Sequence, residues 1–180
     1  MTTTNGMIEI AIRVHTVSQL FNSLDPSPFR EKDLDTDAEE FLVGWVRELP
    51  QATPFTIVVQ LPPEEAARPE AARIGEAFGN YFRHRADVAE RELRELFRVG
   101  RRSLSIGALV LVICLVGSQL FATIIGNPMV ARVLEESLII VGWVANWRPI
   151  EIYLYDWWPI RRRMQLFRRI AAAPVQVRPV

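Results

Sequence analysis

The chain has 180 residues and a mass of 20.6 kDa, and its 21 basic side chains balance its 21 acidic ones. A single cysteine excludes a disulfide framework, and two histidines are too few for a classical zinc site. The charge is unevenly divided: residues 1–97 carry 10 basic and 17 acidic side chains and residues 98–180 carry 11 and 4, which is typical of a membrane protein with an acidic soluble part.

Two segments in the first third of the chain alternate apolar and polar residues, as strands do. Their apolar faces comprise Ile8, Ile10, Ile12 and Val14 in one segment and Phe55, Ile57, Val59 and Leu61 in the other. Between them we expect a short helix over residues 17–24 and a longer one from Thr36, where Thr36 and Glu39 have the spacing of a capping box. Strand, helix and strand predict a βαβ unit over residues 1–68 with parallel strands. Two strands alone form a marginal sheet, so another copy, another subunit or a covering helix is expected to complete it.

The densest acidic run surrounds the start of the longer helix and comprises Glu31, Asp33, Asp35, Asp37, Glu39 and Glu40. Its spacing begins like a calcium-binding EF-hand loop, but Ala38 replaces the required glycine and Gly44 replaces the bidentate glutamate, so calcium binding is not predicted. Carboxylates near a helix N-terminus are stabilised by the helix dipole, which favours a solvated cap. The alternative is a docking loop, in which Glu31, Asp33, Asp35 and Asp37 contact arginines of a partner or of the C-terminal tail.

Residues 69–102 are expected to form a long helix that continues without a stop into the apolar region. Small and apolar residues recur at alternate spacings of four and three along one face: Gly75, Gly79, Phe82, Ala86, Ala89, Leu93, Leu96 and Gly100. This seam contains too many small residues for a strong coiled coil. It indicates either packing back onto the βαβ unit or self-association, and the pattern alone does not separate the two.

The segment 103–125 predicts a transmembrane helix. It contains no charged side chain, and its 23 residues, at about 1.5 Å each, cross the roughly 30 Å hydrocarbon layer of a bilayer. A soluble helix of this length would show a polar stripe, whereas this one holds only serine, threonine and one glutamine. The sequence Gly126-Asn127-Pro128 then combines a helix stop, a turn former and a proline that starts helices.

A second span is predicted over residues 129–147, with a re-entrant or interfacial helix as the alternative. This segment contains three charged side chains, and folding the chain about Asn127 places one of them, Glu135, opposite Gln119. A candidate intramembrane polar cluster therefore comprises Gln119, Arg132, Glu135 and Glu136. Arg132 has the helical spacing to pair with either glutamate, so structural pairing is the simpler interpretation. Proton or cation movement through several copies is the alternative.

Residues 148–180 are predicted to form an aromatic and basic region on the membrane surface. Aromatic side chains gather at its start, at Trp147, Tyr153, Tyr155, Trp157 and Trp158. From Pro159 the pattern predicts an amphipathic helix, whose expected contacts with lipid headgroups are made by Arg161, Arg162, Arg163, Arg168 and Arg169. Nucleic-acid binding is disfavoured, because an apolar stripe runs between these arginines and a span precedes them.

Arginines flank the two predicted spans on the same side, since Arg98, Arg101 and Arg102 precede the first span and Arg148 follows the second. The positive-inside rule then places both termini in the cytoplasm and the turn outside. Charged residues interrupt the apolar residues 8–14, so no cleaved signal peptide is expected.

No constellation for catalysis is present in the sequence. It contains no phosphate-binding glycine loop, no nucleophile elbow and no Ser/His/Asp or Cys/His arrangement, and His15 and His84 are far apart. We therefore expect no enzymatic activity, no cofactor, no metal site and no small-molecule substrate.

The stretches QLFNSLDPSPFREKDLDTDAEEF and RPIEIYLYDWWPIRRRMQLFRRIA resemble those of uncharacterised bacterial two-span membrane proteins with an N-terminal cytoplasmic domain. The resemblance implies a bacterial inner membrane and no particular activity. The expected fold is an α+β membrane protein, in which a small cytoplasmic βαβ unit is followed by a long helix, a two-helix transmembrane hairpin over residues 103–147, and a C-terminal amphipathic basic helix.

Three functions follow from this organisation. The first is a self-associating scaffold or accessory subunit that presents its acidic cytoplasmic domain to a partner. The second is an oligomeric ion or proton conductor that uses Glu135 and Glu136, and the third is an auxiliary subunit of a membrane enzyme. The expected partners are the lipid bilayer and either further copies of the chain or another membrane subunit, and nucleic acid is not among them.

Overall fold

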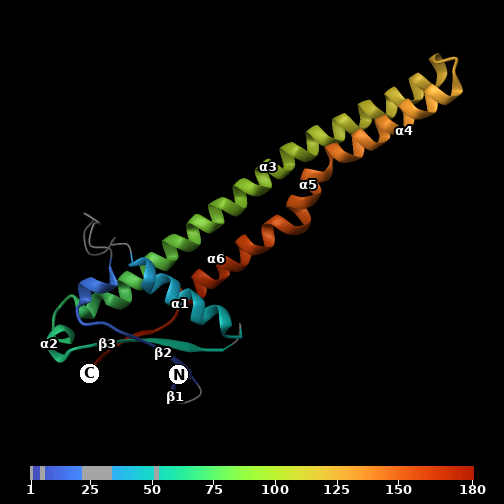
Figure 1. Cartoon of the computed structure of the whole chain (residues 1–180). Helices are drawn as coiled ribbons and strands as arrows, with labels where there is room; N and C mark the ends of the chain where they lie inside the picture. The colour runs from blue at the N-terminus through green and yellow to red at the C-terminus, as the bar shows by residue number, and fades with distance from the viewer. Residues whose placement is uncertain (1, 5–6, 22–33, 51–52) are drawn as a thin grey trace. The chain divides into compact units, whose positions relative to one another are not determined.

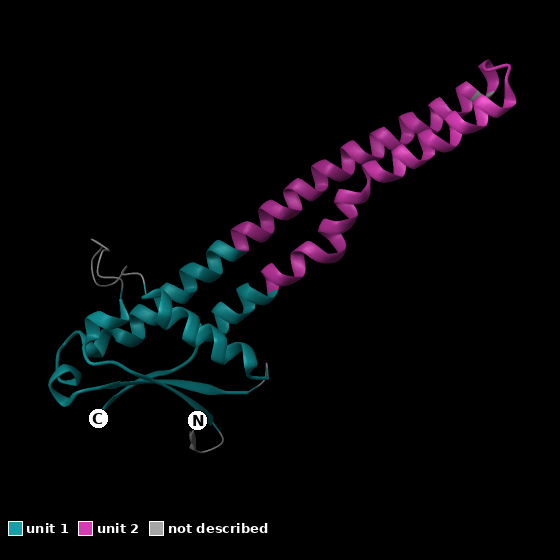
Figure 2. Cartoon of the chain, viewed as in Figure 1, with its two compact units in different colours: residues 1–89, 162–180 teal, residues 90–161 magenta. Residues whose placement is uncertain are grey.

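The computed structural model describes residues 2–4, 7–21, 34–50 and 53–180, which are mostly helical and contain one small sheet (Figure 1). The chain divides into two compact units (Figure 2). Residues 1–89 and 162–180 form unit 1, which contains the sheet, and residues 90–161 form unit 2. These boundaries differ from the expected ones, because residues 162–180 fold with the N-terminal part of the chain and the segment 69–102 is shared between the two units.

The sheet of unit 1 has four strands in the order β1-β2-β3-β4. They are β1 (Thr2–Thr4), β2 (Met7–Arg13), β3 (Phe55–Leu61) and β4 (Val175–Pro179). β2, β3 and β4 are parallel and β1 is antiparallel to β2, so the predicted parallel pairing of the two apolar segments is confirmed. The expectation that a partner or a helix completes the sheet is wrong, because β4, from the C-terminus of the same chain, pairs with β3.

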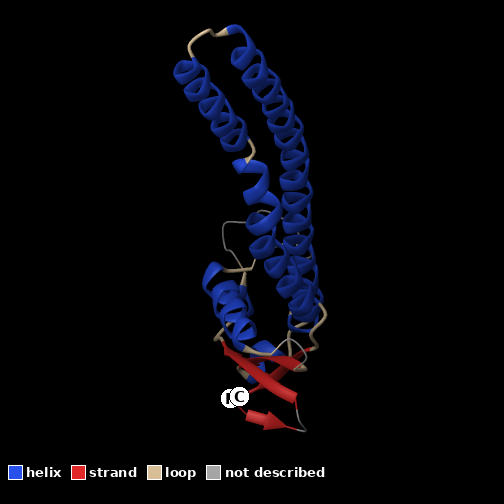
Figure 3. Ribbon diagram, turned by 90° about the vertical axis from the view of Figure 1, so that its right-hand side faces the viewer, coloured by secondary structure: helices blue, strands red, loops and turns tan. Residues whose placement is uncertain are grey.

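Helices cover one face of this sheet (Figures 1 and 3). In unit 1 they are α1 (Thr36–Glu48), the first turns of α3 (Ile74–Ile124) and the end of α6 (Trp157–Ala171). Three short elements connect the strands and helices: η1 (Val17–Leu20), α2 (Pro63–Ala66) and η2 (Ala71–Arg73). The short helix expected over residues 17–24 is thus one turn of 3₁₀ helix, and residues 22–24 lie outside the described part of the chain.

The core of unit 1 lies between the sheet and these helices. Its fully buried side chains include Leu42 and Val46 of α1, Ile57 and Val59 of β3, Ile74, Phe78 and Phe82 of α3, and Ile170 of α6. Ala86 and Ala89 of the same helix are also buried. The first part of the small-residue seam therefore packs within the chain's own unit, which decides between the two interpretations of the pattern for residues 74–89.

The amphipathic period predicted for the C-terminal helix is present in α6, but its apolar stripe has a different neighbour. Met164, Phe167 and Ile170 are buried, and the last two belong to the core of unit 1. Phe167 lies with its ring centroid 6.1 Å from that of Phe82 on α3. The stripe thus faces the sheet-containing unit and not a lipid surface.

An ion pair crosses the opposite face of the sheet. The guanidinium of Arg178 on β4 donates to both carboxylate oxygens of Glu9 on β2, at 3.2 and 3.1 Å. The hydrogen bond to Glu9, together with its charge, raises the pKa of Arg178 above its ordinary value. Because β3 separates the two strands, this pair connects the C-terminal strand to the N-terminal half of the sheet.

In unit 2, the second part of α3 and α4 (Pro128–Ala145) lie side by side and antiparallel (Figure 2). Asn127 caps α4, since its side-chain oxygen accepts from the backbone N–H of Met129 at 3.1 Å. The chain then continues through α5 (Trp147–Glu151) and η3 (Ile152–Asp156), a π-helical turn that leads into α6. The second part of the seam packs here, because a Cβ at Gly100 would lie 2.9 Å from the side chain of Ile152.

Candidate functional site

A long apolar surface on unit 2 is the first candidate for function. By length and composition, α3 is the one helix in the described part of the chain that could cross a membrane, and only 17% of its most apolar stretch is buried. Exposed large apolar side chains continue along both helices and include Ile106, Leu109, Ile113 and Ile124 on α3 and Met129, Val133, Ile140 and Val144 on α4. Soluble monomers rarely expose apolar patches larger than a few hundred Å². This surface therefore requires a covering other than water.

The predicted intramembrane cluster is assembled only in part. Arg132 Nε donates to Glu136 Oε1 at 3.1 Å, which gives the helical pair that the spacing suggested. Glu135 is partly buried and Gln119 is exposed, and in the described residues no hydrogen bond joins them. Three of the four residues thus lie on α4.

Asn146 joins the two helices, a role that no motif or period in the sequence predicts. Its side-chain amide is buried and donates to the carbonyl oxygens of Gly107 on α3, at 3.0 Å, and Gly142 on α4, at 2.9 Å. A Cβ at Gly107 would lie 2.8 Å from this side chain, so only glycine fits there. Folding the chain about Asn127 places residue 108 opposite Asn146, next to the glycine that Asn146 contacts.

The predicted aromatic belt lies around η3 and is largely exposed. Trp147, Tyr155 and Trp158 are exposed, whereas Trp157 donates from its indole N–H to the carbonyl oxygen of Tyr153 at 2.9 Å. Arg148 bridges the π-helical turn, with ion pairs to Glu151 at 3.2 Å and to Asp156 at 3.1 Å. Rings with an apolar body and a polar edge are the side chains that settle at a membrane–water interface.

The five C-terminal arginines, which were predicted as a group, separate into different environments. Arg161 and Arg162 are exposed, and Arg161 stacks 5.5 Å from the Trp157 ring centroid. Arg163 and Arg168 each interact with other residues. Arg169 is partly buried and donates to the carbonyl oxygens of Leu49, Pro50 and Thr53, at 3.5, 2.9 and 2.5 Å, with its guanidinium 5.2 Å from the Phe55 ring centroid. The donors of Arg169 thus already satisfy carbonyl oxygens at the end of α1 and in the loop after it, whereas the lipid-headgroup role expected of this residue stays a prediction.

Replacing Arg169 by methionine should lower the free energy of unfolding of unit 1 by about 1–2 kcal/mol, because backbone carbonyl oxygens, two of them in part-buried hydrogen bonds, lose a charged donor. Urea unfolding in a neutral detergent, where no anionic headgroup is present, measures this loss. Arg162→Met is the matched control on the same helix and should leave the stability unchanged. Equal stability of the two variants would show that these contacts of Arg169 do not stabilise unit 1, and would favour the lipid-headgroup role.

One of the acidic residues at the start of α1 caps this helix. Asp35, and not the expected Thr36, is the N-cap residue, and its Oδ1 accepts from the backbone N–H of Asp37 at 3.0 Å. Asp37 is exposed in the first turn. Glu31 and Asp33, the other members of the predicted docking loop, lie outside the described residues.

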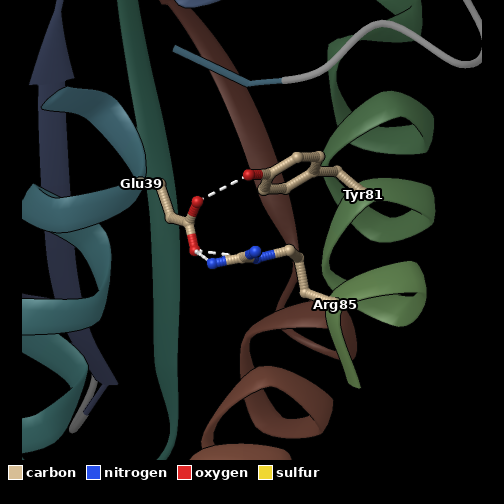
Figure 4. A network of polar contacts seen from close by, with 3 residues as sticks. All are labelled: Glu39, Tyr81 and Arg85. Carbon is tan, nitrogen blue, oxygen red and sulfur yellow. Dashed lines mark hydrogen bonds and ion pairs between the residues drawn. The ribbon is translucent and has the colours of Figure 1, made fainter. Parts of the chain in front are cut away.

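Glu39 does not return to the helix start as a capping box would require, and instead joins α1 to α3 (Figure 4). One carboxylate oxygen accepts from the phenol of Tyr81, and the other accepts from Nε and Nη2 of Arg85, at 3.0 and 2.7 Å. The Arg85 guanidinium also lies 5.3 Å from the ring centroid of Phe167 on α6. This network joins α1, α3 and α6 to one another, so its role is to stabilise unit 1.

The described residues contain no group of three or more His, Cys, Asp or Glu side chains placed to hold a metal ion. The lone Cys114 is buried on α3.

No family model, no curated protein and no solved structure matches the chain.

Proposed function

We propose that the chain is an integral protein of a bacterial inner membrane, with spans over residues 103–125 and 129–147, and that unit 1 is a cytoplasmic platform for a partner. The observation that carries this proposal is the exposed apolar surface shared by α3 and α4. Lipid tails can cover such a surface without any further protein, and helices satisfy their own backbone groups in hydrocarbon. The proposed role is that of a non-enzymatic scaffold or accessory subunit.

The polar residues of unit 2 are arranged as this proposal requires. Arg101 and Arg102 are exposed just before the apolar stretch, and the exposed Trp147 and Arg148 follow α4. The Arg132–Glu136 pair lies close to the turn at Asn127, where charged groups can reach the opposite interface. Tightly packed small residues, such as Gly107 and Gly142, are what helix pairs in lipid use for close approach.

Thiol labelling tests this topology directly. In a Cys114→Ala background, Gly126→Cys introduces a thiol at the turn, where a new side chain meets no other atom within 4 Å, and Val180→Cys introduces one at the exposed C-terminus. An impermeant maleimide applied to intact spheroplasts should label the turn variant, and should label the C-terminal variant only after the membrane is opened. Labelling of both variants, or only of the C-terminal one, in intact spheroplasts would contradict the proposed orientation.

The ion-conductor alternative depends on Glu135 and Glu136. Since Arg132 neutralises Glu136 in a helical pair, we propose that these residues are structural and expect Glu135→Gln with Glu136→Gln to leave proton and cation flux into proteoliposomes unchanged. A flux that is present in the parent protein and lost in this variant would favour the conductor.

A further inference from the structure

One edge of the sheet in unit 1 is only partly covered. β1 pairs with β2 from Met7 to Glu9, and within the described residues no strand pairs with that edge from Ile10 to Arg13. Ile8 N–H donates to Pro54 and Val14 N–H donates to Gln60, so the even-numbered residues of β2 hydrogen-bond toward β3. In a parallel ladder the residues between them point the other way. The backbone N–H and C=O groups of Ala11 and Arg13 therefore face outward along an open edge.

A groove runs along this open edge, between β2 and α1. Its larger hollow, of about 410 Å³, has residues 11–14 on one side and Leu20, Asp37, Ala38 and Phe41 on the other. A second hollow, of about 150 Å³, shares Ala11 and Phe41 with the first and continues toward Glu9 and Trp45. A strand edge beside a helix is the geometry with which proteins accept an extended peptide as an additional strand.

The side chains of the groove define the chemistry of such a peptide. Phe41 is 42% exposed and makes an edge-to-face contact with Trp45, at 6.1 Å between ring centroids, so an apolar surface is available beside the strand. Asp35 and Asp37 line the other end of the groove, and neither forms an ion pair within the described residues. Arg13 also lines the larger hollow, and Arg178 lines the smaller one as the partner of Glu9, so the carboxylates left for a ligand are those of Asp35 and Asp37. Apolar positions beside these two carboxylates complement a segment in which apolar and basic side chains alternate.

We propose that the open edge of β2 binds an extended basic segment of a partner protein by strand addition. The backbone of this segment pairs with Ala11 and Arg13, its apolar side chains contact Phe41, and its basic side chains approach Asp35 and Asp37. The inference rests on the proposed function, because it names the chemistry of the partner that the platform receives. The groove lies wholly within unit 1, so its binding can be measured independently of the membrane topology.

The test uses the full chain in a neutral detergent and a short fluorescent peptide of alternating lysine and valine, followed by fluorescence anisotropy and corrected for binding to empty micelles. Two matched peptides serve as controls: one carries glutamate in place of lysine, and the other is N-methylated at alternate positions, which keeps its charge but removes backbone donors. Saturable binding of the first peptide alone is the expected result. No saturable binding, or equal binding of all three peptides, overturns the proposal.

A pair of variants locates the binding. Asp37→Lys should raise the dissociation constant of the lysine–valine peptide about tenfold or more, since it reverses the charge at the rim of the groove. Glu40→Lys makes the same charge change at an exposed position of α1 outside the groove and should have little effect. Bound peptide should also slow amide hydrogen exchange at Ala11 and Arg13. The proposal is overturned if both variants weaken peptide binding equally, or if bound peptide leaves exchange at these amides unchanged. A chain that spans the membrane but binds no peptide overturns this inference and leaves the proposed membrane topology intact.

Discussion

Arginines introduced together at Val112 and Val116 should prevent α3 from entering the membrane. Both valines are 55% exposed and lie in the middle of the apolar stretch, so neither substitution disturbs the packing of the chain. An arginine near the centre of a span costs about 2.5–3.5 kcal/mol of insertion free energy, and the pair should cost about twice that. The measurement is the fraction of newly made chain that sediments with membranes.

The matched control places the same two arginines on the same helix outside the apolar stretch, at Val88 and Val99, which are also exposed. Substitutions at water-exposed positions usually change stability by less than about 0.5 kcal/mol. The control should therefore remain in the membrane fraction at the parent level. If the two double variants behave alike, the surface at Val112 and Val116 faces water and lipid is not its covering.

Phe82→Ala should destabilise unit 1 by about 3–5 kcal/mol, the usual cost of emptying the site of a buried aromatic ring. Phe82 is fully buried on α3, and its ring lies 6.5 Å from that of Phe78 and 6.1 Å from that of Phe167 on α6. The cavity would thus open where the C-terminal segment meets the N-terminal part of the chain. Urea unfolding, followed by amide hydrogen exchange of β3, measures the loss.

Phe41→Ala is the control for this substitution, because Phe41 is a phenylalanine of the same unit that remains largely outside the core. Its removal should cost less than that of Phe82, about 1–2 kcal/mol, since 42% of its surface is exposed already. Faster exchange in β4 should accompany the Phe82 variant, because β4 pairs with β3. A similar loss of stability in both variants would show that residues 162–180 do not share a core with Phe82.

The parallel pairing of β2 with β3, the long helix and the apolar stripe of α6 could be predicted because each follows from a local period. Ile10 and Ile57 each belong to a set of apolar residues that recurs at every second position, and Met164, Phe167 and Ile170 recur at helical spacing. A period shows which face is apolar, but it does not show what covers that face. The period of α6 is therefore equally compatible with lipid, although Phe167 and Ile170 belong to the core of unit 1.

The features that the sequence does not predict depend on contacts between residues far apart in the chain. β4 spans Val175–Pro179 and pairs with β3 across more than half the chain, and its composition gives a weak strand signal of its own. The donors of Arg169 reach carbonyl oxygens around Pro50, and Glu39 bonds to Tyr81 and Arg85. None of these pairs has a sequence spacing that a helix or strand period would reveal.

The central claim is that hydrocarbon surrounds residues 103–125, and extraction of isolated membranes with alkaline carbonate tests it most directly. Peripheral proteins are released by this treatment, whereas spanning helices are retained. The account predicts that the intact chain stays in the membrane pellet and enters solution only with detergent. Recovery of the intact chain as a monodisperse species in the carbonate supernatant would contradict it.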